Sequence, residues 1–174
     1  MLDFRFSNAP NSENQDAVAN LLIQPRLWIP SGDYPAHLDW RDKALAEIAG
    51  DKKRAMIAYW GKEAVGSVVY QRDPTQPETI EIRNLSIEPY ARGRHIASFL
   101  VRQVEREAAL DFPGSTRMVT DTKRTNAGLI AFAFENGYHV ETVVALDGTD
   151  FAHNGVQDVV LVKDLTFPIE AASF

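Results

Sequence analysis

The chain has 174 residues, of which 45% are hydrophobic and 24% are charged, and its 24 acidic and 18 basic residues give a net charge of −6. This length predicts one compact domain over residues 1–174. The negative charge argues against general affinity for nucleic acid or an anionic membrane, because both attract a cationic surface. The absence of cysteine excludes disulfides, thiolate metal ligands and thiol nucleophiles.

The location of the protein is predicted from its apolar runs. None of them approaches the roughly 18 residues needed to cross a bilayer. The first residues, Met-Leu-Asp-Phe-Arg-Phe, lack the basic and apolar regions of a signal peptide. We therefore expect a cytoplasmic protein without membrane contact. The histidines at 37, 95, 139 and 153 have no ligand spacing, so we also expect no metal site.

The first half of the chain alternates between strand and helix patterns. An alternating strand at residues 2–6 precedes a helix from Ser12, where Ser12 and Gln15 have capping-box spacing. A loop at 25–38 then leads to a helix at 39–50 that Asp39 can cap. Strands follow at 54–60, 63–70 and 79–87. The first two flank Gly61-Lys62, which suits a type II′ hairpin because glycine comes first in the two-residue loop.

The second half contains two further helices. Ile96, Leu100 and Val104 recur every four residues and predict an amphipathic helix at 94–110. A short strand at 116–121, a helix at 126–136 and strands at 139–147 and 157–165 complete the order βααβββαβαββ. This order predicts an α/β fold, a mixed sheet of six to seven strands with parallel and antiparallel pairs, flanked by about four helices.

The junction between the strand at 79–87 and the next helix carries the clearest binding pattern. The first N–H groups of a helix have no intrahelical partners and attract phosphate. Arg92 and Arg94 add positive charge, and Gly93 lets the backbone approach a ligand. A solvated turn before a surface helix explains the same residues equally well.

This junction resembles the signature of the Gcn5-related N-acetyltransferases (GNAT), which is Arg or Gln, two residues, Gly, one residue, then Gly or Ala. Arg92 and Ala97 match its first and last positions, while His95 replaces the middle glycine. A second match is the family's later helix, where Asn126, Gly137 and Tyr138 have the expected separations. The resemblance covers nearly the whole chain and implies the GNAT fold.

The resemblance also implies a site for acetyl-CoA as cosubstrate. The Leu85 carbonyl and the Ile87 amide would pair with the pantetheine arm like an added strand, and the Ile87 amide would also lie near the acetyl carbonyl. Asn126 would contact the pantetheine or its thiol end. The pyrophosphate would be held by the backbone amides of Arg92, Gly93, Arg94, His95, Ile96 and Ala97.

Two residues are candidates for acid–base catalysis. Glu81 stands six residues before Ile87, the spacing of the glutamate base in the histone-acetylating branch of the family, and an even spacing would place both on one face of the strand. Glu81 could equally be a solvent-facing partner of Arg83. The family's tyrosine acid is replaced by Ala133, so Tyr138 is the remaining hydroxyl candidate, with an aromatic plug as its structural alternative.

Two functions remain open. The first is transfer of an acetyl group from acetyl-CoA to a primary amine of a small molecule or peptide, by direct attack in a ternary complex. The second is a CoA-binding or regulatory protein-interaction module with little or no turnover. We expect residues 25–38, with His37, and residues 148–156 to border the acceptor. A homodimer through the last strands or the tail at 167–174 is a further prediction.

Overall fold

The computed structural model describes residues 4–8, 12–23, 37–145 and 157–165. Its elements, in chain order, are β1 (Phe4–Asn8), α1 (Ser12–Leu21), α3 (His37–Ala49), β2 (Arg54–Trp60), β3 (Glu63–Arg72), β4 (Thr79–Ile87), the short 3₁₀ helix η1 (Pro89–Ala91), α4 (Ile96–Asp111), β5 (Arg117–Lys123), α5 (Ala127–Glu135), β6 (His139–Ala145) and β7 (Gln157–Asp164). The predicted order is confirmed.

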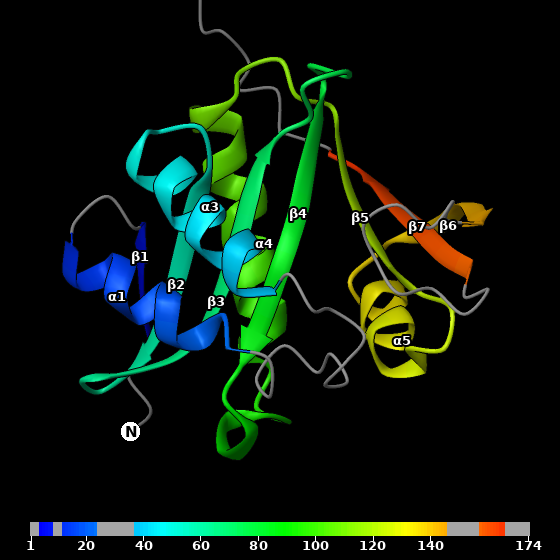
Figure 1. Ribbon diagram of the computed structural model, residues 1–174. Helices are drawn as coiled ribbons and strands as arrows, with labels where there is room; N and C mark the ends of the chain where they lie inside the picture. The colour runs from blue at the N-terminus through cyan, green and yellow to red at the C-terminus, as the bar shows by residue number, and fades with distance from the viewer. Residues whose placement is uncertain (1–3, 9–11, 24–36, 146–156, 166–174) are drawn as a thin grey trace, which may run out of the picture.

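The strands form one seven-stranded sheet in the order β1-β2-β3-β4-β5-β7-β6. The described pairs are antiparallel except β4 with β5, which run parallel and pair only along Thr79–Glu81 and Arg117–Val119. Beyond these residues the two strands separate, as Figure 1 shows below the point where they meet. The predicted mixed sheet is therefore confirmed, and it is split at its one parallel pair.

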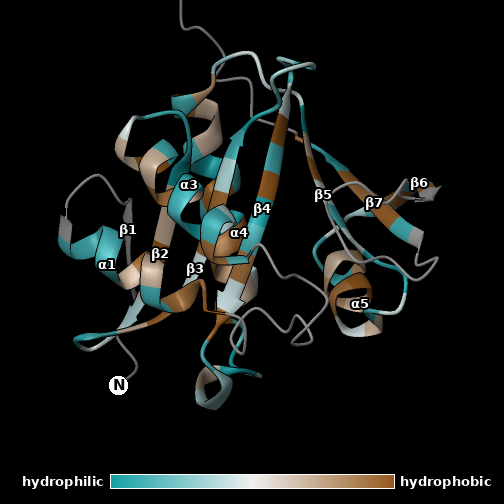
Figure 2. Cartoon of the chain, in the orientation of Figure 1, coloured by the Kyte–Doolittle hydropathy of each residue, from teal (hydrophilic) through white to brown (hydrophobic). Residues whose placement is uncertain are grey.

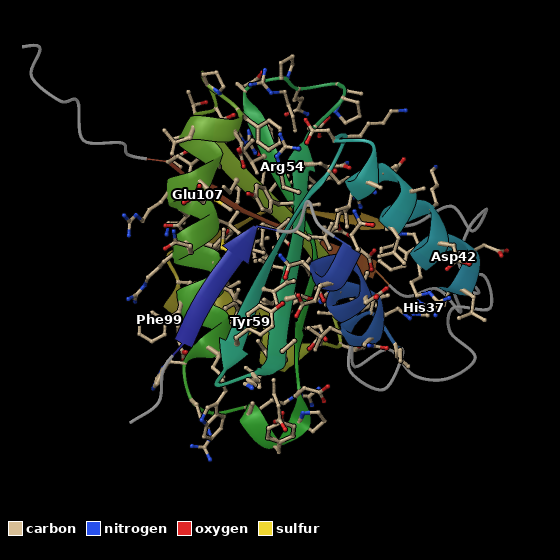
Figure 3. All side chains as sticks on the ribbon, turned by 90° about the vertical axis from the view of Figure 1, so that its left-hand side faces the viewer. His37, Asp42, Arg54, Tyr59, Phe99 and Glu107 are labelled. Atoms are coloured by element: carbon tan, nitrogen blue, oxygen red, sulfur yellow. The ribbon has the colours of Figure 1, made fainter. Side chains whose placement is uncertain are left out.

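Helices cover both faces of the sheet, as the side view in Figure 3 shows. On one face, α1 and α3 pack over a cluster that includes Val18, Ile48 and Val69. On the other face, α4 and α5 pack over the larger cluster, which includes Val68, Leu100 and Ala133. Figure 2 shows that hydrophobic residues follow the central strands and α5, while α3 is largely hydrophilic outside its buried positions. The sheet face covered by α1 and α3 is called the α1/α3 face, and the face covered by α4 and α5 is called the α4 face.

The turns explain where the element boundaries agree with the sequence and where they differ. Gly61 has φ +63° and Lys62 is not among the residues with positive φ, as the predicted type II′ hairpin requires. Helix α3 begins at His37, two residues before Asp39, and the His37 ring nitrogen Nε2 lies 2.7 Å from the Leu22 carbonyl oxygen just after α1.

Within the described ranges, no helix is long and apolar enough to span a membrane.

Candidate functional site

The separated part of β4 exposes backbone hydrogen-bonding groups at its edge. The Glu88 N–H donates to the Val65 carbonyl of β3 at 2.9 Å. Hydrogen bonding alternates along an antiparallel pair, so Ser86 also directs its backbone groups toward β3, whereas Leu85 and Ile87 direct theirs to the opposite side. That side faces β5, whose pairing with β4 ends at Glu81. Among the described residues, no strand pairs with that side of β4 beyond Glu81, so the Leu85 N–H and C=O and the Ile87 N–H are available to an added strand, while the Ile87 carbonyl accepts from Arg92 Nε.

A β-bulge reverses the faces of β4 halfway along the strand. Tyr70 of β3 is opposite Ile82, but the next residue, Val69, is opposite Asn84, so Arg83 is the extra residue. The prediction that Glu81 shares a face with Leu85 and Ile87 is therefore wrong. Ile82, Leu85 and Ile87 all contribute to the cluster on the α4 face. Glu81 and Asn84 instead face the α1/α3 side, like their partners on β3.

Glu81 is the centre of a polar network on this face. Its carboxylate accepts a hydrogen bond from Gln71 Nε2 at 2.7 Å and forms an ion pair with Arg83 at 2.5 Å. Arg83 also lies 3.7 Å from the Asp121 carboxylate of β5, so it links the two strands beside the point where they separate. The Glu81 side chain is 13% exposed. Glu81 therefore pairs with Arg83, which was one of the two possibilities raised from the sequence. Its side chain is mostly buried, however, and does not face open solvent.

Glu81 and Asp121 also line a cavity of about 310 Å³ on the same face. Its wall includes one arginine, Arg117, and the carboxylates of Asp73, Glu81, Asp121, Glu141 and Asp158. Such a wall favours cationic or hydrogen-bond-donating ligands over anions. Among the described residues, no group of three or more His, Asp or Glu side chains is arranged to hold a metal ion.

The turn after β4 holds the two arginines through specific contacts. Arg92 Nε donates to the Ile87 carbonyl at 3.1 Å, and the Arg94 guanidinium lies 4.7 Å from the centre of the Trp60 ring, a cation–π distance. Gly93 has φ +72°, and no atom lies within 4 Å of the position that a Cβ would take. The backbone of the turn is therefore open on that side.

His95 adopts the left-handed conformation, with φ 60° and ψ 13°, immediately before α4. This conformation favours glycine, which the GNAT signature has at this position. The first helical hydrogen bond runs from the Phe99 N–H to the His95 carbonyl at 3.0 Å. The N–H groups of Ile96 and Ala97 therefore belong to the helix start, where no intrahelical acceptor exists, and are suited to an anion.

The residues predicted on the later helix have mainly structural contacts. Asn126 caps α5, because its Oδ1 accepts from the Leu129 N–H at 3.2 Å while its Nδ2 donates to Thr122 Oγ1 at 3.2 Å. Ala133, at the family's tyrosine position, is buried in the core.

Tyr138 is only 6% exposed, and its hydroxyl lies 3.9 Å from Met118 Sδ. Burial and the nearby Glu105 raise its pKa. Tyr138 therefore fills space in the core as an aromatic plug, which was the structural alternative raised from the sequence.

The predicted acceptor loop lies mostly outside the described residues, as does the segment 148–156. His37 of this loop is described at the start of α3, where its ring stacks on that of Trp40 with 5.6 Å between the ring centres. No role was predicted for Gln71 or Asn84. Their positions depend on the register between β3 and β4 and on the bulge in β4, neither of which has a direct signal in the amino-acid sequence.

Comparison with solved structures identifies the fold. An N-acetyltransferase from Staphylococcus aureus Mu50 is 17% identical, with 94% of this chain and 99% of that chain covered, and its TM-score is 0.74. The ribosomal-protein-S18-alanine N-acetyltransferase from Escherichia coli is 13% identical over 99% and 100% of the two chains, with a TM-score of 0.71. A GNAT acetyltransferase from Elizabethkingia anophelis with acetyl-CoA bound is 18% identical over 93% and 98%, with a TM-score of 0.66. The protein has the GNAT fold.

The family follows from a second comparison. A profile described as the acetyltransferase (GNAT) family matches residues 16–138. The chain therefore belongs to the GNAT acetyltransferase family. A search of curated protein sequences finds no match.

Proposed function

We propose that the protein transfers an acetyl group from acetyl-CoA to a primary amine, by direct attack in a ternary complex. The single observation that carries this proposal is the open edge of β4 at Leu85 and Ile87, which leads directly into the Arg92–Ala97 turn. Membership of the GNAT family and the acetyl-CoA bound to the Elizabethkingia anophelis protein support the choice of cosubstrate.

The residues present fit acetyl-CoA in two ways. The Leu85 carbonyl and the Ile87 N–H would pair with the amides of the pantetheine arm, as a strand pairs with a sheet edge. The N–H groups at the start of α4, beside the open backbone at Gly93, would hold the pyrophosphate. Arg94 lies beside this turn, so it adds positive charge there.

In the proposed reaction, the cosubstrate supplies a thioester whose carbonyl carbon accepts the amine and whose thiolate departs. The Ile87 N–H would donate to the carbonyl oxygen as negative charge develops on it. Glu81 would take the proton that the amine releases. Leu85 and Ile87 lie four and six residues from Glu81, or roughly 13 and 20 Å along an extended strand, so this proton would reach Glu81 through a chain of water molecules.

The acceptor would carry its amine on a small molecule or peptide, preferably a cationic one, because carboxylates dominate the cavity wall. The Escherichia coli neighbour, by its name, acts on the alanine of a ribosomal protein, so a peptide N-terminus belongs among the candidates. The catalytic roles proposed here do not include Tyr138, because its hydroxyl is directed into the core.

A CoA-binding module with little or no turnover is the second candidate. The observation that favours it is Ala133, which is buried and offers no hydroxyl at the family's acid position. Loss of a general acid typically lowers a rate by about 10²–10⁴. A thiolate is already a good leaving group, so we favour the enzyme.

The test is release of CoA thiol from acetyl-CoA in the presence of spermidine, kanamycin or an alanine-initiated peptide. The chain has no cysteine, so a thiol reagent detects only CoA. Turnover with at least one amine supports the enzyme. A rise in melting temperature with CoA but no release with any amine supports the binding module, and no response to either ligand contradicts both.

The role of Glu81 is tested by the pH dependence of the rate. Glu81→Gln should lower the rate most near neutral pH, because at high pH hydroxide can take the proton that the neutral amine releases as it attacks. Asp121→Asn is the matched control, since it removes the other carboxylate near Arg83. Equal changes in the pH profiles of the two variants would exclude Glu81 as the specific base.

A further inference from the structure

We propose that Asn84 positions the acceptor, its side-chain oxygen Oδ1 accepting a hydrogen bond from the attacking primary amine. This inference rests on the proposed function and adds a residue to it. Asn84 Oδ1 is buried, and it has no hydrogen-bond partner among the described residues. Buried polar atoms are nearly always paired, so an orphaned carbonyl oxygen indicates a group that completes its bonding when it binds.

The bulge places Asn84 at the point where the reaction is proposed. Because Arg83 is the extra residue, Asn84 faces the α1/α3 side, as Glu81 does three residues earlier. Ser86, two residues later on the same face, donates from its Oγ to the Leu21 carbonyl at 2.8 Å. Asn84 therefore lies between the network beside the cavity and the end of α1.

The backbone next to Asn84 belongs to the open edge of β4. Leu85 is the first residue after the bulge whose N–H and C=O turn away from β3. A thioester aligned along that edge would therefore lie beside the Asn84 side chain. An amine bound to Asn84 Oδ1 would approach the acetyl carbonyl from the α1/α3 face, the face that carries Glu81.

The chemistry of a primary amine fits this arrangement. The neutral amine has two N–H bonds and one lone pair. One N–H would donate to Asn84 Oδ1 and the other to a water that begins a chain toward Glu81, roughly 10 Å away along the strand, so the lone pair would point toward the acetyl carbon. As the N–C bond forms, the proton passes through water to Glu81. The C–S bond then breaks, and its electron pair leaves with the sulfur.

The arrangement selects the class of acceptor. A tertiary amine has no N–H to donate and cannot form an amide. A hydroxyl has a single hydrogen, so it cannot satisfy Asn84 and give up a proton to water at the same time. A site with a buried acceptor discriminates against ligands that leave it unpaired. Asn84 would therefore favour primary amines over alcohols.

The experiment compares Asn84→Leu, which removes the oxygen at similar size, with Asn84→Asp, which keeps an acceptor oxygen. The acceptor is whichever of spermidine, kanamycin or the alanine-initiated peptide the wild type acetylates best. Asn84→Leu should lower kcat/KM for the amine about 10- to 100-fold, because the bond is made to an amine that gains positive charge. Most of the loss should be in kcat, because the amine gains positive charge only as the N–C bond forms, and Asn84→Asp should recover most of the activity.

Stability separates positioning from a structural role. Removing an unpaired buried oxygen should not lower the urea midpoint of the ligand-free protein. Ser86→Ala is the matched control on the same face: it loses the bond to Leu21, so it should lower the urea midpoint while kcat/KM for the amine stays within about twofold. The Kd for acetyl-CoA should be the same in the wild type and in Asn84→Leu.

The outcomes distinguish this inference from the function on which it rests. A wild-type protein that acetylates none of the amines overturns the proposed function and the inference with it. If the wild type is active and Asn84→Leu is equally active, the inference alone is overturned. It is also overturned if Asn84→Leu lowers the urea midpoint and acetyl-CoA affinity together, because Asn84 would then be structural.

Discussion

Replacing His95 by glycine should stabilise the folded protein. The left-handed conformation of His95, at φ 60° and ψ 13°, costs a residue with a Cβ roughly 1–2 kcal/mol. Glycine avoids this cost but makes the unfolded chain more flexible, which opposes the gain by about 0.5–1 kcal/mol. The expected net gain is therefore about 0.8 kcal/mol, within a range of about 0–1.5 kcal/mol, or about 2–3 °C in melting temperature for a domain of this size.

The matched control is His95→Ala, which removes the imidazole but keeps the Cβ. Urea unfolding of the two variants at equal m-values isolates the backbone contribution, because both lack the ring. His95→Gly should be the more stable of the two. If the two variants unfold at the same urea concentration, His95 is not held in the left-handed conformation, and the account of the turn before α4 is wrong.

Three further predictions concern the surroundings of the site. Gly66→Ala should destabilise the protein by about 1–3 kcal/mol in urea unfolding, because a Cβ there would lie 2.6 Å from Ile87 Cδ1 and 3.1 Å from the Ser86 carbonyl oxygen, which the strand fixes in place; a neutral effect would contradict this packing. Tyr138→Phe should leave the pH profile of kcat unchanged, because the hydroxyl is buried in the core; a lost basic limb would restore Tyr138 as a catalytic acid. Trp60→Leu should weaken CoA binding about two- to fivefold in calorimetry by removing the cation–π contact that holds Arg94, and unchanged affinity would show that Arg94 needs no such support.

The order of elements was predictable because each one has a local signal. The spacing of Ile96, Leu100 and Val104 predicted α4, and Gly61 predicted the hairpin and its turn type. Such signals depend on residues close together in the chain. They do not state which strands separate, and the gap between β4 and β5 became visible only from the pairing.

The faces of β4 were predicted wrongly although the sequence contains a signal. Its apolar residues on the α4 face are Ile80, Ile82, Leu85 and Ile87, so the spacing of two is interrupted by a spacing of three. That interruption marks the bulge at Arg83. The prediction that Glu81 and Ile87 share a face assumed regular alternation over the six residues between them and did not include this bulge.

The contact of Glu81 with Gln71, and the choice between a core and a cleft position for Tyr138, have no local signal in the sequence. The bond between Gln71 and Glu81 depends on the register between β3 and β4, which no local pattern specifies. A tyrosine hydroxyl after a helix suits a core or a cleft equally well. Packing between α5 and the sheet decides between them, and it turns Tyr138 toward Met118.

Amide hydrogen exchange at Leu85 and Ile87 tests the central claim most directly. If the pantetheine arm of acetyl-CoA pairs with the open edge of β4, NMR should show that the cosubstrate slows exchange at Ile87, with slower exchange also in the Arg92–Ala97 turn. Binding that protects neither β4 nor this turn would contradict the proposed site.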